Sequence, residues 1–397
     1  MDDLTRTVLR LADRDLAINL TQELVQTPSV VGEEGPIGAV IARQMQDVGL
    51  QNVRKQEVAP DRYNVIGEAD FGPGPEIVLT GHMDTKPVCV GWDQDPYAGS
   101  LVSDRLYGHA IMDMKAGVAG QIAAASALTI GALPLKGRVV VAAVCDHMGE
   151  QMGSRAYFAD SKADMAVLGE LTDNRVAIGH RGRYYWDITT IGRSAHTCHK
   201  HEAINAVALA AEVVLEIEKI DHRPPLDDTV RDLFGEELFM AAGRIYGGLP
   251  PGGPSMIPDS CVIRVDSRPQ PGVEAEAVRA VIEEAIGRAA ARNVELRWEM
   301  VLADSKPGHL VGLDAPVVRY LRRASEIVQG ESDVVGMSWL GDTSTFGPWV
   351  STAIFGPGGE PVYTPNECLE LRDIEVATKV YALTAAFALS QHLEVTG

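Results

Sequence analysis

The sequence predicts a protein of the α/β class in which a second, α+β domain is inserted into the first. The length of 397 residues is too great for one small domain and suggests two. Strands alternate with helices in the first part of the chain. From about residue 180 the order becomes strand–helix–strand–strand–helix–strand, which is typical of a self-contained ferredoxin-like unit.

In the first part, helical periodicity interrupted by Gly and Pro predicts helices over residues 16–26, 35–48 and 115–128. Apolar and β-branched runs predict strands over residues 64–68, 76–80, 137–145 and 163–168. The run at 137–145 reads GRVVVAAVC, which is typical of a strand buried on both faces. Polar side chains follow these strands, as expected for an α/β sheet with its site at the carboxyl edge.

The second part is expected to contain strands over residues 184–191, 241–245, 261–266 and 294–302, with helices over residues 202–217 and 273–288. A helix at 315–327, a strand at 352–355 and a helix at 372–391 are then predicted to complete the first domain. We therefore expect a first domain of residues 1–180 and 304–397, with an inserted domain of residues 181–303.

Composition and charge argue against several classes of protein. The formal net charge of −20 argues against nucleic acid or an anionic membrane as a partner. No apolar run approaches the length of about 18 residues that a membrane span requires. The acidic start lacks the pattern of a signal peptide, and the five cysteines form no CxxC pair, so we expect a cytoplasmic protein with reduced thiols. An anionic substrate would need its own local Arg or His.

The stretch IVLTGHMD at residues 77–84 joins a predicted strand to the first candidate site residues. His82 can offer an imidazole to a metal ion, and Asp84 can hold that ring from behind, as carboxylates near metal sites do. The alternative is a strand end with a solvated His and Asp. Asp113 lies where a loop enters the helix predicted at 115–128, so it could be a metal ligand or a helix N-cap. Glu170 follows the strand predicted at 163–168.

Several motifs distributed over nearly the whole chain resemble those of one enzyme family. They are GHMDTKP at 81–87, YGHAIMDMKAG at 107–117, GEL at 169–171, GRSAH at 192–196 and YTPNE at 363–367. The chain is similar to the dinuclear metallohydrolases that include acetylornithine deacetylase, succinyl-diaminopimelate desuccinylase, aminoacylase and carboxypeptidase G. This resemblance implies a catalytic α/β domain with a central mixed sheet and an inserted lid domain that often dimerises. It therefore implies a homodimer or a higher homo-oligomer.

The resemblance also implies roles for individual residues. His82, Asp113 and Glu170 match the ligands of one family metal, with Asp113 the usual bridge to the second. Asp84 matches the carboxylate that orients the His. In the inserted domain, His196 matches a lid histidine that steadies the oxyanion, and Arg268 lies near residues that hold substrate carboxylates in the family.

The sequence departs from the family at the second metal. His147 and Met148 stand where the family has a glutamate base and a glutamate ligand, and Tyr363 stands where it has a histidine ligand. A thioether and a neutral phenol are poor partners for a hard or borderline divalent ion. Because both losses concern one metal, we expect a mononuclear site for one divalent ion: Mn, Zn, Fe or Co. Such a site can lower the pKa of water from about 15.7 toward 7.

The proton acceptor is open between two residues of the same loop. His147 occupies the position of the family base, and its ordinary pKa of about 6.5 suits that task. Glu150, three residues later, is the rival. His109 replaces a common family Arg and is expected either to contact substrate or to hold a loop. His199 and His201 lie beside His196 and could suggest another metal, but a solvated helix start is the more common explanation.

These observations favour a metal-dependent hydrolase that cleaves a C–N bond of a small carboxylate-bearing substrate. The resemblance extends to members that replace an aromatic amine by hydroxyl, so it also implies hydrolytic deamination of an amine such as 5-nitroanthranilate. In that reaction the nitro group takes up the negative charge and no second metal is needed. The rings of Tyr363 and His147 would suit such a flat aromatic substrate. The alternatives are an N-acyl amino acid deacylase or dipeptidase that works with one metal, and a catalytically silent member that binds a small molecule.

Overall fold

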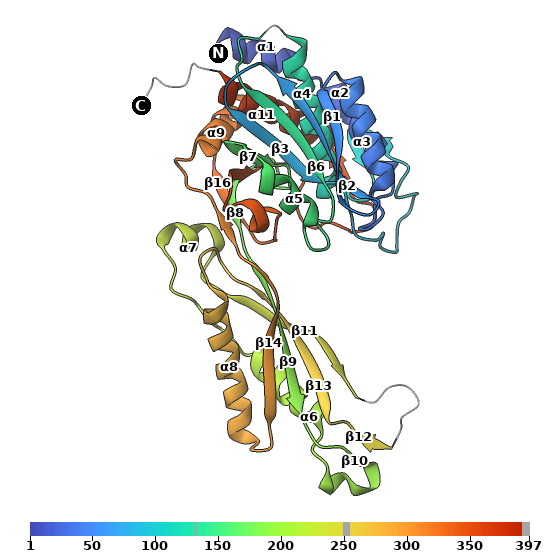
Figure 1. The fold of residues 1–397 in the computed structure, drawn as a ribbon, viewed down its shortest axis with the longest axis vertical. Coiled ribbons are helices and arrows are strands. Elements are labelled where there is room, and N and C mark those ends of the chain that lie inside the picture. Colours follow the sequence, from blue (N-terminus) through green and yellow to red (C-terminus); the bar gives the residue numbers. More distant parts are fainter. Residues whose placement is uncertain (132, 249–254, 391–397) are drawn as a thin grey trace. The chain divides into compact units, whose positions relative to one another are not determined.

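The structure is a computed structural model that describes residues 1–131, 133–248 and 255–390. The chain divides into two compact units. Figure 1 shows both, with colours that follow the residue number. Unit 1 comprises Met1–Gly179, Val311–Val335 and Gly341–Gly397, and unit 2 comprises His180–Leu310 and Gly336–Leu340. Unit 2 is therefore inserted into the sequence of unit 1.

The centre of unit 1 is a mixed sheet with the strand order β1-β2-β6-β3-β7-β17-β8. The strands are β1 (Gln51–Ala59), β2 (Arg62–Asp70), β3 (Glu76–His82), β6 (Arg138–Val144), β7 (Met165–Leu168), β8 (Val176–His180) and β17 (Ser351–Ile354). β3 pairs in parallel with β6 on one side and with β7 on the other. β1 and β2 form an antiparallel margin beside β6. The carboxyl ends of β6, β3 and β7 therefore meet at one edge of the sheet.

The composition of the central strands explains their burial. β3 reads EIVLTGH and is buried along its whole length, and β6 reads RVVVAAV and is buried after its first residue. Such continuous apolar runs are typical of parallel strands covered on both faces. Phe158 of α5 (Met152–Asp160) and Phe346 of α10 (Thr343–Phe346) pack against Val78 and Val140 in one buried cluster. α4 (Ala116–Ile130) also contacts β3 and β6.

The remaining elements of unit 1 include helices around α4 and a small three-stranded sheet. The helices are α1 (Asp3–Leu11), α2 (Arg14–Val25), α3 (Gly35–Asp47), α9 (Pro316–Gln329) and α11 (Leu371–Leu389). The small sheet has the order β18-β5-β4 and consists of β4 (Ser100–Val102), β5 (Arg105–Tyr107) and β18 (Cys368–Glu370). Cys368 pairs with Tyr107, and this pairing brings the YTPNE turn close to the segment that contains Asp113.

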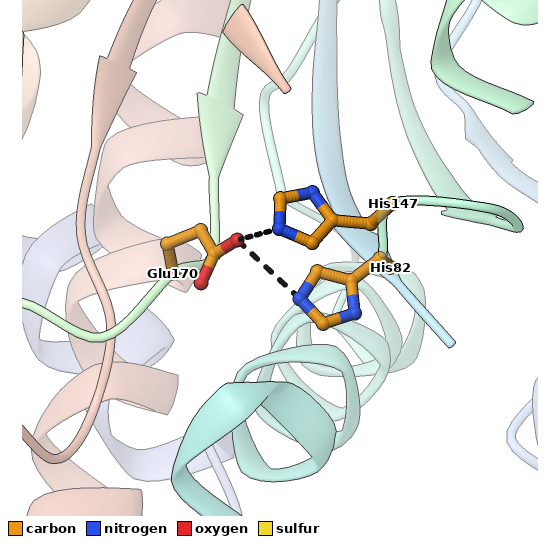
Figure 2. Close-up of side chains that lie close together, drawn as sticks. All are labelled: His82, His147 and Glu170. Atoms are coloured by element: carbon orange, nitrogen blue, oxygen red, sulfur yellow. Dashed lines mark ion pairs between the residues drawn. The ribbon is translucent and has the colours of Figure 1, made fainter. Parts of the chain in front are cut away.

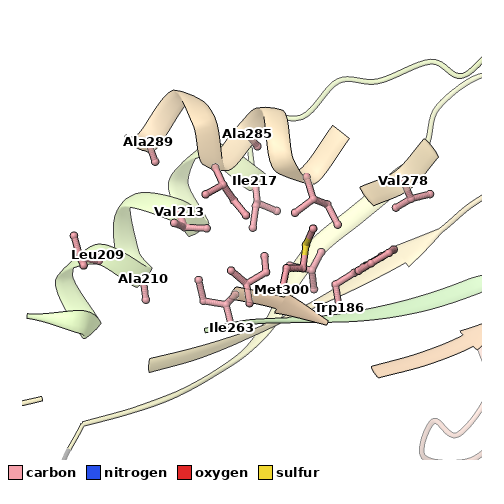
Figure 3. Close-up of a cluster of buried hydrophobic side chains, with 14 of the residues drawn as sticks. Trp186, Leu209, Ala210, Val213, Ile217, Ile263, Val278, Ala285, Ala289 and Met300 are labelled. Carbon is pink, nitrogen blue, oxygen red and sulfur yellow. The ribbon is translucent and has the colours of Figure 1, made fainter. Parts of the chain in front are cut away.

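Unit 2 is a ferredoxin-like fold with an antiparallel sheet in the order β11-β13-β9-β14. Its βαββαβ series consists of β9 (Arg183–Ile191), α6 (Ala206–Ile217), β11 (Phe239–Gly247), β13 (Ser260–Arg268), α8 (Ala275–Arg292) and β14 (Arg297–Lys306). The inward side chains of the strands, such as Trp186 and Ile263, pack beneath α6 and α8 (Figure 3). The short elements are α7 (Asp228–Phe234), β10 (Ala195–His196), β12 (Met256–Ile257) and the 3₁₀ helix η2 (Thr197–Glu202). β15 (His309–Leu310) and β16 (Val334–Met337) lie where the chain passes between the units.

The predicted fold class is confirmed, with a mixed central sheet in one unit and a ferredoxin-like second unit. The predicted helix at 372–391 is α11, and its expected last residue lies outside the described residues. Sequence periodicity missed α1, β1, α5 and the small sheet. β1 was missed because its side chains are exposed or only half-buried, so it has no apolar alternation. Among the described residues, no helix is both long enough and apolar enough to cross a bilayer.

Candidate metal centre

Three neighbouring parallel strands position three residues of the candidate metal centre. His82 is the last residue of β3, His147 lies three residues after β6, and Glu170 lies two residues after β7. The register pairs His82 with Val144 of β6 and Thr80 with Leu168 of β7. The strands therefore end side by side, and the side chains that follow them converge (Figure 2).

The imidazole of His82 is fully buried and contacts three residues. Its Nδ1 lies 2.8 Å from the main-chain oxygen of Asp84, and its Nε2 lies 2.8 Å from Oδ1 of Asp113 and 3.4 Å from Oε1 of Glu170. A carbonyl oxygen only accepts, so Nδ1 carries the hydrogen and Nε2 faces the two carboxylates. Burial by itself would lower the pKa of His82, but the charge of Glu170 and the hydrogen bond to Asp113 raise it well above its ordinary value.

Asp84 orients His82 in a different way from the one expected. The contact to the ring comes from its main-chain oxygen, while its carboxylate accepts hydrogen bonds from the backbone N–H groups of His147 and Met148, at 2.9 and 2.8 Å. The side chain points to the next loop because a buried carboxylate needs donors, and that loop offers two adjacent N–H groups. Asp84 therefore fixes the position of the His147 loop.

His147 lies beside His82 with its ring parallel to it. The ring centroids are 4.2 Å apart and the planes differ by 6°. Nε2 of His147 lies 3.8 Å from Oε1 of Glu170, and Nδ1 lies 2.8 Å from Oδ1 of Asp342. Burial and the neighbouring His82 would lower the pKa of His147, but Asp342 and Glu170 raise it overall. The atoms His82 Nε2, His147 Nε2 and Glu170 Oε1 all face one point, as Figure 2 shows.

Asp113 belongs to a short π-helical turn, Ile111–Lys115, that leads into α4. Its own backbone angles are not helical, and the N-cap of α4 is Lys115. The capping alternative for Asp113 is therefore wrong. Its carboxylate instead contacts His82 and also receives a hydrogen bond from the Tyr363 side chain.

The donor set fits a divalent cation. Two imidazole nitrogens and the Glu170 carboxylate converge, and the Asp113 carboxylate contacts His82. This mixture of ligands suits borderline transition metals. Two ligands that each lie about 2.1 Å from a tetrahedral ion are about 3.4 Å apart. The separations of 2.8, 3.4 and 3.8 Å between these nitrogens and oxygens bracket that value.

Met148 and Tyr363, which stand at the departures from the family pattern, contact each other. The Tyr363 hydroxyl lies 3.8 Å from the Met148 sulfur. Tyr363 is in the left-handed region with a φ of 58°, and its backbone N–H donates to Glu367. Burial and the charge of Asp113 raise the pKa of Tyr363 well above its ordinary value, so the phenol stays neutral.

Of the two candidate proton acceptors, only His147 is near the converging ligands. Glu150 is exposed, and its backbone N–H donates to Asp146. No hydrogen bond or ion pair links its carboxylate to His82, Asp113 or Glu170 within the described part of the chain.

His109 is fully buried and lies close to Tyr363, with ring centroids 5.9 Å apart. Its Nε2 lies 2.8 Å from the main-chain oxygen of Lys86, and burial lowers its pKa. Because that oxygen only accepts, Nε2 carries the hydrogen and Nδ1 keeps a lone pair. Nδ1 has no hydrogen-bond partner among the described residues.

The other expected site residues belong to unit 2. His196 ends β10 and is exposed, and its Nδ1 accepts from the backbone N–H of Cys198. Arg268 forms a bidentate pair with Asp266, two residues earlier on β13, at 2.8 and 2.9 Å. His199, His201 and Glu202 group their ligand atoms on η2, but all three are exposed.

Three residues near the centre were not identified from the sequence. Asp342 is buried and contacts His147. The Lys115 ammonium donates to the main-chain oxygen of Thr27, and burial lowers its pKa to about 7. Burial raises the pKa of Glu367 to about 7, and its carboxylate accepts from the backbone of Met112 and Tyr363. The YTPNE motif contains Glu367 and so could have indicated it, whereas no sequence pattern indicates Asp342.

The comparison with known families agrees with this geometry. The model of peptidase family M20/M25/M40 matches residues 78–386. The chain belongs to this family. As an M20-family protein it is a metal-dependent hydrolase of C–N bonds, and the matched range contains every residue of the candidate metal centre.

Named relatives agree with the family assignment, and a solved structure shows the same fold. This M20-family chain is 24% identical over 375 residues to acetylornithine deacetylase of Aliivibrio fischeri (strain MJ11), covering 90% of the chain and 95% of that protein. It is 27% identical over 394 residues to succinyl-diaminopimelate desuccinylase of Methylobacterium radiotolerans, covering 92% and 95%. The crystal structure of human carnosine dipeptidase 1 has the same fold, with a TM-score of 0.76, 17% identity and coverage of 98% and 99%.

Proposed function

We propose that this protein hydrolyses a C–N bond of a small carboxylate-bearing substrate at a single divalent metal ion. The observation that supports a single ion is the contact between Met148 and Tyr363, because a thioether and a neutral phenol occupy the positions of two family ligands. His82, Asp113 and Glu170 would hold the ion. When bound, the ion acts as a Lewis acid and lowers the pKa of water toward neutrality.

The surroundings of the centre favour a flat, aromatic substrate. The rings of Tyr97, His109 and Tyr363 lie near one another, with centroid separations of 5.9 Å from His109 to each tyrosine. The lone pair on His109 Nδ1 suits the N–H group of a substrate amine. The Lys86 ammonium lies 4.8 Å from the centre of the Tyr363 ring and offers a cation for the substrate carboxylate.

The reaction that we propose is the hydrolytic deamination of an electron-poor aromatic amine, such as 5-nitroanthranilate. The oxygen of water forms a bond to the ring carbon that bears the amine, and the nitro group takes up the negative charge. The carbon–nitrogen bond then breaks, and the nitrogen leaves as ammonia with a proton from water. The products are the hydroxy acid and ammonia, so atoms and charge balance without a further reactant.

Hydrolysis of an N-acyl amino acid or a dipeptide is the second candidate. The names of the relatives favour it, because they describe a deacetylase, a desuccinylase and a dipeptidase. This candidate also needs water, a Lewis acid and a cation for a carboxylate.

A substrate panel tests the proposal. Metal-loaded protein is incubated with 5-nitroanthranilate, N-acetyl amino acids and dipeptides, and released ammonia or amine is measured. We expect ammonia from 5-nitroanthranilate and little turnover of the acylated substrates. Turnover of the acylated substrates alone would overturn the deamination proposal in favour of the second candidate.

We further propose that unit 2 joins copies of this chain into a homo-oligomer. β11 is an edge strand of its sheet and exposes Ile245 and Tyr246 by about half of their surfaces. Sedimentation velocity of wild-type protein and of the Ile245→Lys variant would test this, with a monomeric wild type as the contradicting result.

A further inference from the structure

We infer that His147 is a ligand of the metal ion, oriented by Asp342, and is not the general base. This inference rests on the proposed metal centre. It replaces the role of general base that the sequence position of His147 suggested. It follows from the hydrogen-bond partners of the two imidazoles and from the direction in which each ring points.

The partner of each Nδ1 atom determines where the lone pair of the ring lies. Nδ1 of His147 faces Oδ1 of Asp342 at 2.8 Å, and an ionised carboxylate only accepts, so Nδ1 donates. The lone pair of His147 is then on Nε2, which faces Oε1 of Glu170 at 3.8 Å. His82 has the same arrangement, with the main-chain oxygen of Asp84 as its acceptor.

The two parallel imidazoles therefore direct lone pairs toward the same carboxylate oxygen. Lone pairs and carboxylate oxygens repel one another unless a proton or a cation lies between them. His82, His147 and Glu170 thus place acceptor atoms around one point, which suits a divalent ion (Figure 2). Asp113 adds a carboxylate that contacts Nε2 of His82.

A ligand role excludes the base role, because Nε2 has one lone pair. If that lone pair binds the ion, it cannot also take a proton from the attacking water. A carboxylate that holds Nδ1–H of a metal-binding histidine is the usual arrangement in metal sites, since it fixes the tautomer and strengthens the ligand. The group formed by Asp342 and His147 has this arrangement.

Asp342 is itself held firmly, as a positioning residue should be. It precedes α10, and the Gln151 side chain contacts this segment, donating to Gly341 and accepting from the hydroxyls of Ser344 and Thr345. Phe346 of α10 stacks on Phe158 of α5, with ring centroids 3.7 Å apart. These contacts hold the Asp342 carboxylate within hydrogen-bond distance of His147 Nδ1.

Counting coordinated imidazoles in the wild-type protein tests the inference. Copper(II) is loaded into the metal-free protein, and pulsed electron paramagnetic resonance detects the remote nitrogen of each coordinated histidine. We expect two coupled imidazoles in the wild type and one in His147→Gln. Metal affinity, measured by competition with a chelator, should fall about 10- to 100-fold or more in His147→Gln.

Two further variants separate the roles. Glu150→Gln, in the same loop, is the matched control and should keep both the affinity and the two-imidazole signal. Asp342→Asn should weaken binding about 10- to 100-fold and change the signal of one remote nitrogen, which a merely structural role would not do. A tightly bound ion with one coupled imidazole in the wild type, and unchanged affinity in His147→Gln, would overturn the inference and leave the metal centre standing. Failure of the wild type to bind any ion would overturn both.

Discussion

The Tyr363 hydroxyl lies 3.8 Å from the Met148 sulfur, so the two residues expected to replace family metal ligands contact each other. Asp113, which the resemblance matches to a bridging ligand, receives a hydrogen bond from Tyr363 as well as contacting His82. A neutral phenol thus stands where a second cation would balance the aspartate. The Asp113 carboxylate is then not shared between two cations. It is therefore a more basic ligand for the single ion.

Metal stoichiometry tests this arrangement. We expect the wild type to retain about one equivalent of divalent ion per chain after gel filtration, because the exposed cluster on η2 would lose any weakly bound ion. The double variant Met148→Glu/Tyr363→His introduces one carboxylate and one imidazole at these positions. It should therefore retain a second equivalent of divalent ion. Elemental analysis measures both, with Met148→Leu as the control for packing. Two tightly held ions in the wild type would contradict the single-ion proposal.

Removal of a ligand should abolish activity through loss of the metal. His82→Ala and Glu170→Gln are expected to lower kcat/KM by about a thousandfold or more, because a Lewis acid contributes several kcal/mol and about 1.4 kcal/mol is a factor of ten. Treatment with a chelator should have the same effect, and the added ion should reverse it. His199→Ala, in the exposed cluster on η2, is the matched control. Wild-type turnover in either ligand variant would refute the assignment.

The stability of the metal-free protein should decrease as the pH rises. The pKa values of His82 and His147 are raised above 6.5 in the folded protein, chiefly by Glu170 for His82 and by Asp342 for His147, against the effect of burial. Between pH 6.5 and these raised values, the folded state binds more protons than the unfolded state, so the free energy of unfolding falls. Bound metal replaces the protons and should remove this dependence.

Thermal unfolding of the metal-free and metal-loaded proteins between pH 6 and pH 9 measures this effect. We expect the stabilisation by metal to grow with pH as the two imidazoles lose their protons. A metal-free protein that becomes more stable over this range would contradict the prediction.

Lys86 is predicted to bind the substrate carboxylate. Lys86→Met keeps the length of the side chain and removes its charge, so it should raise KM about tenfold or more and leave kcat within a few-fold. An amine without the carboxylate, such as 4-nitroaniline, should be insensitive to the substitution. An equal loss for both substrates would indicate that Lys86 acts on the structure of the loop and not on the carboxylate.

The site residues that lie near strand ends could be predicted from the sequence, and those that depend on distant segments could not. His82, His147 and Glu170 follow apolar runs, and parallel neighbouring strands bring such residues to one edge. Asp342 lies 195 residues from His147, and no motif or periodicity connects them. The HxD spacing predicts that the Asp84 carboxylate holds His82, whereas the main-chain oxygen makes that contact. The carboxylate instead accepts from the N–H groups of the next loop, which the spacing cannot show.

Asp84 has two functions, which a single substitution separates. Asp84→Asn keeps the main-chain oxygen that holds His82 and changes only the carboxylate that accepts from His147 and Met148. An amide has one acceptor oxygen, so one buried N–H loses its partner, and we expect the free energy of unfolding to fall by about 1–3 kcal/mol. Metal affinity should fall as well, because the loop carries His147. Denaturant unfolding and chelator competition measure the two effects, with Asp95→Asn, which affects an exposed hydrogen bond to Tyr97, as the control. A variant with unchanged stability would mean that the carboxylate does not hold the loop.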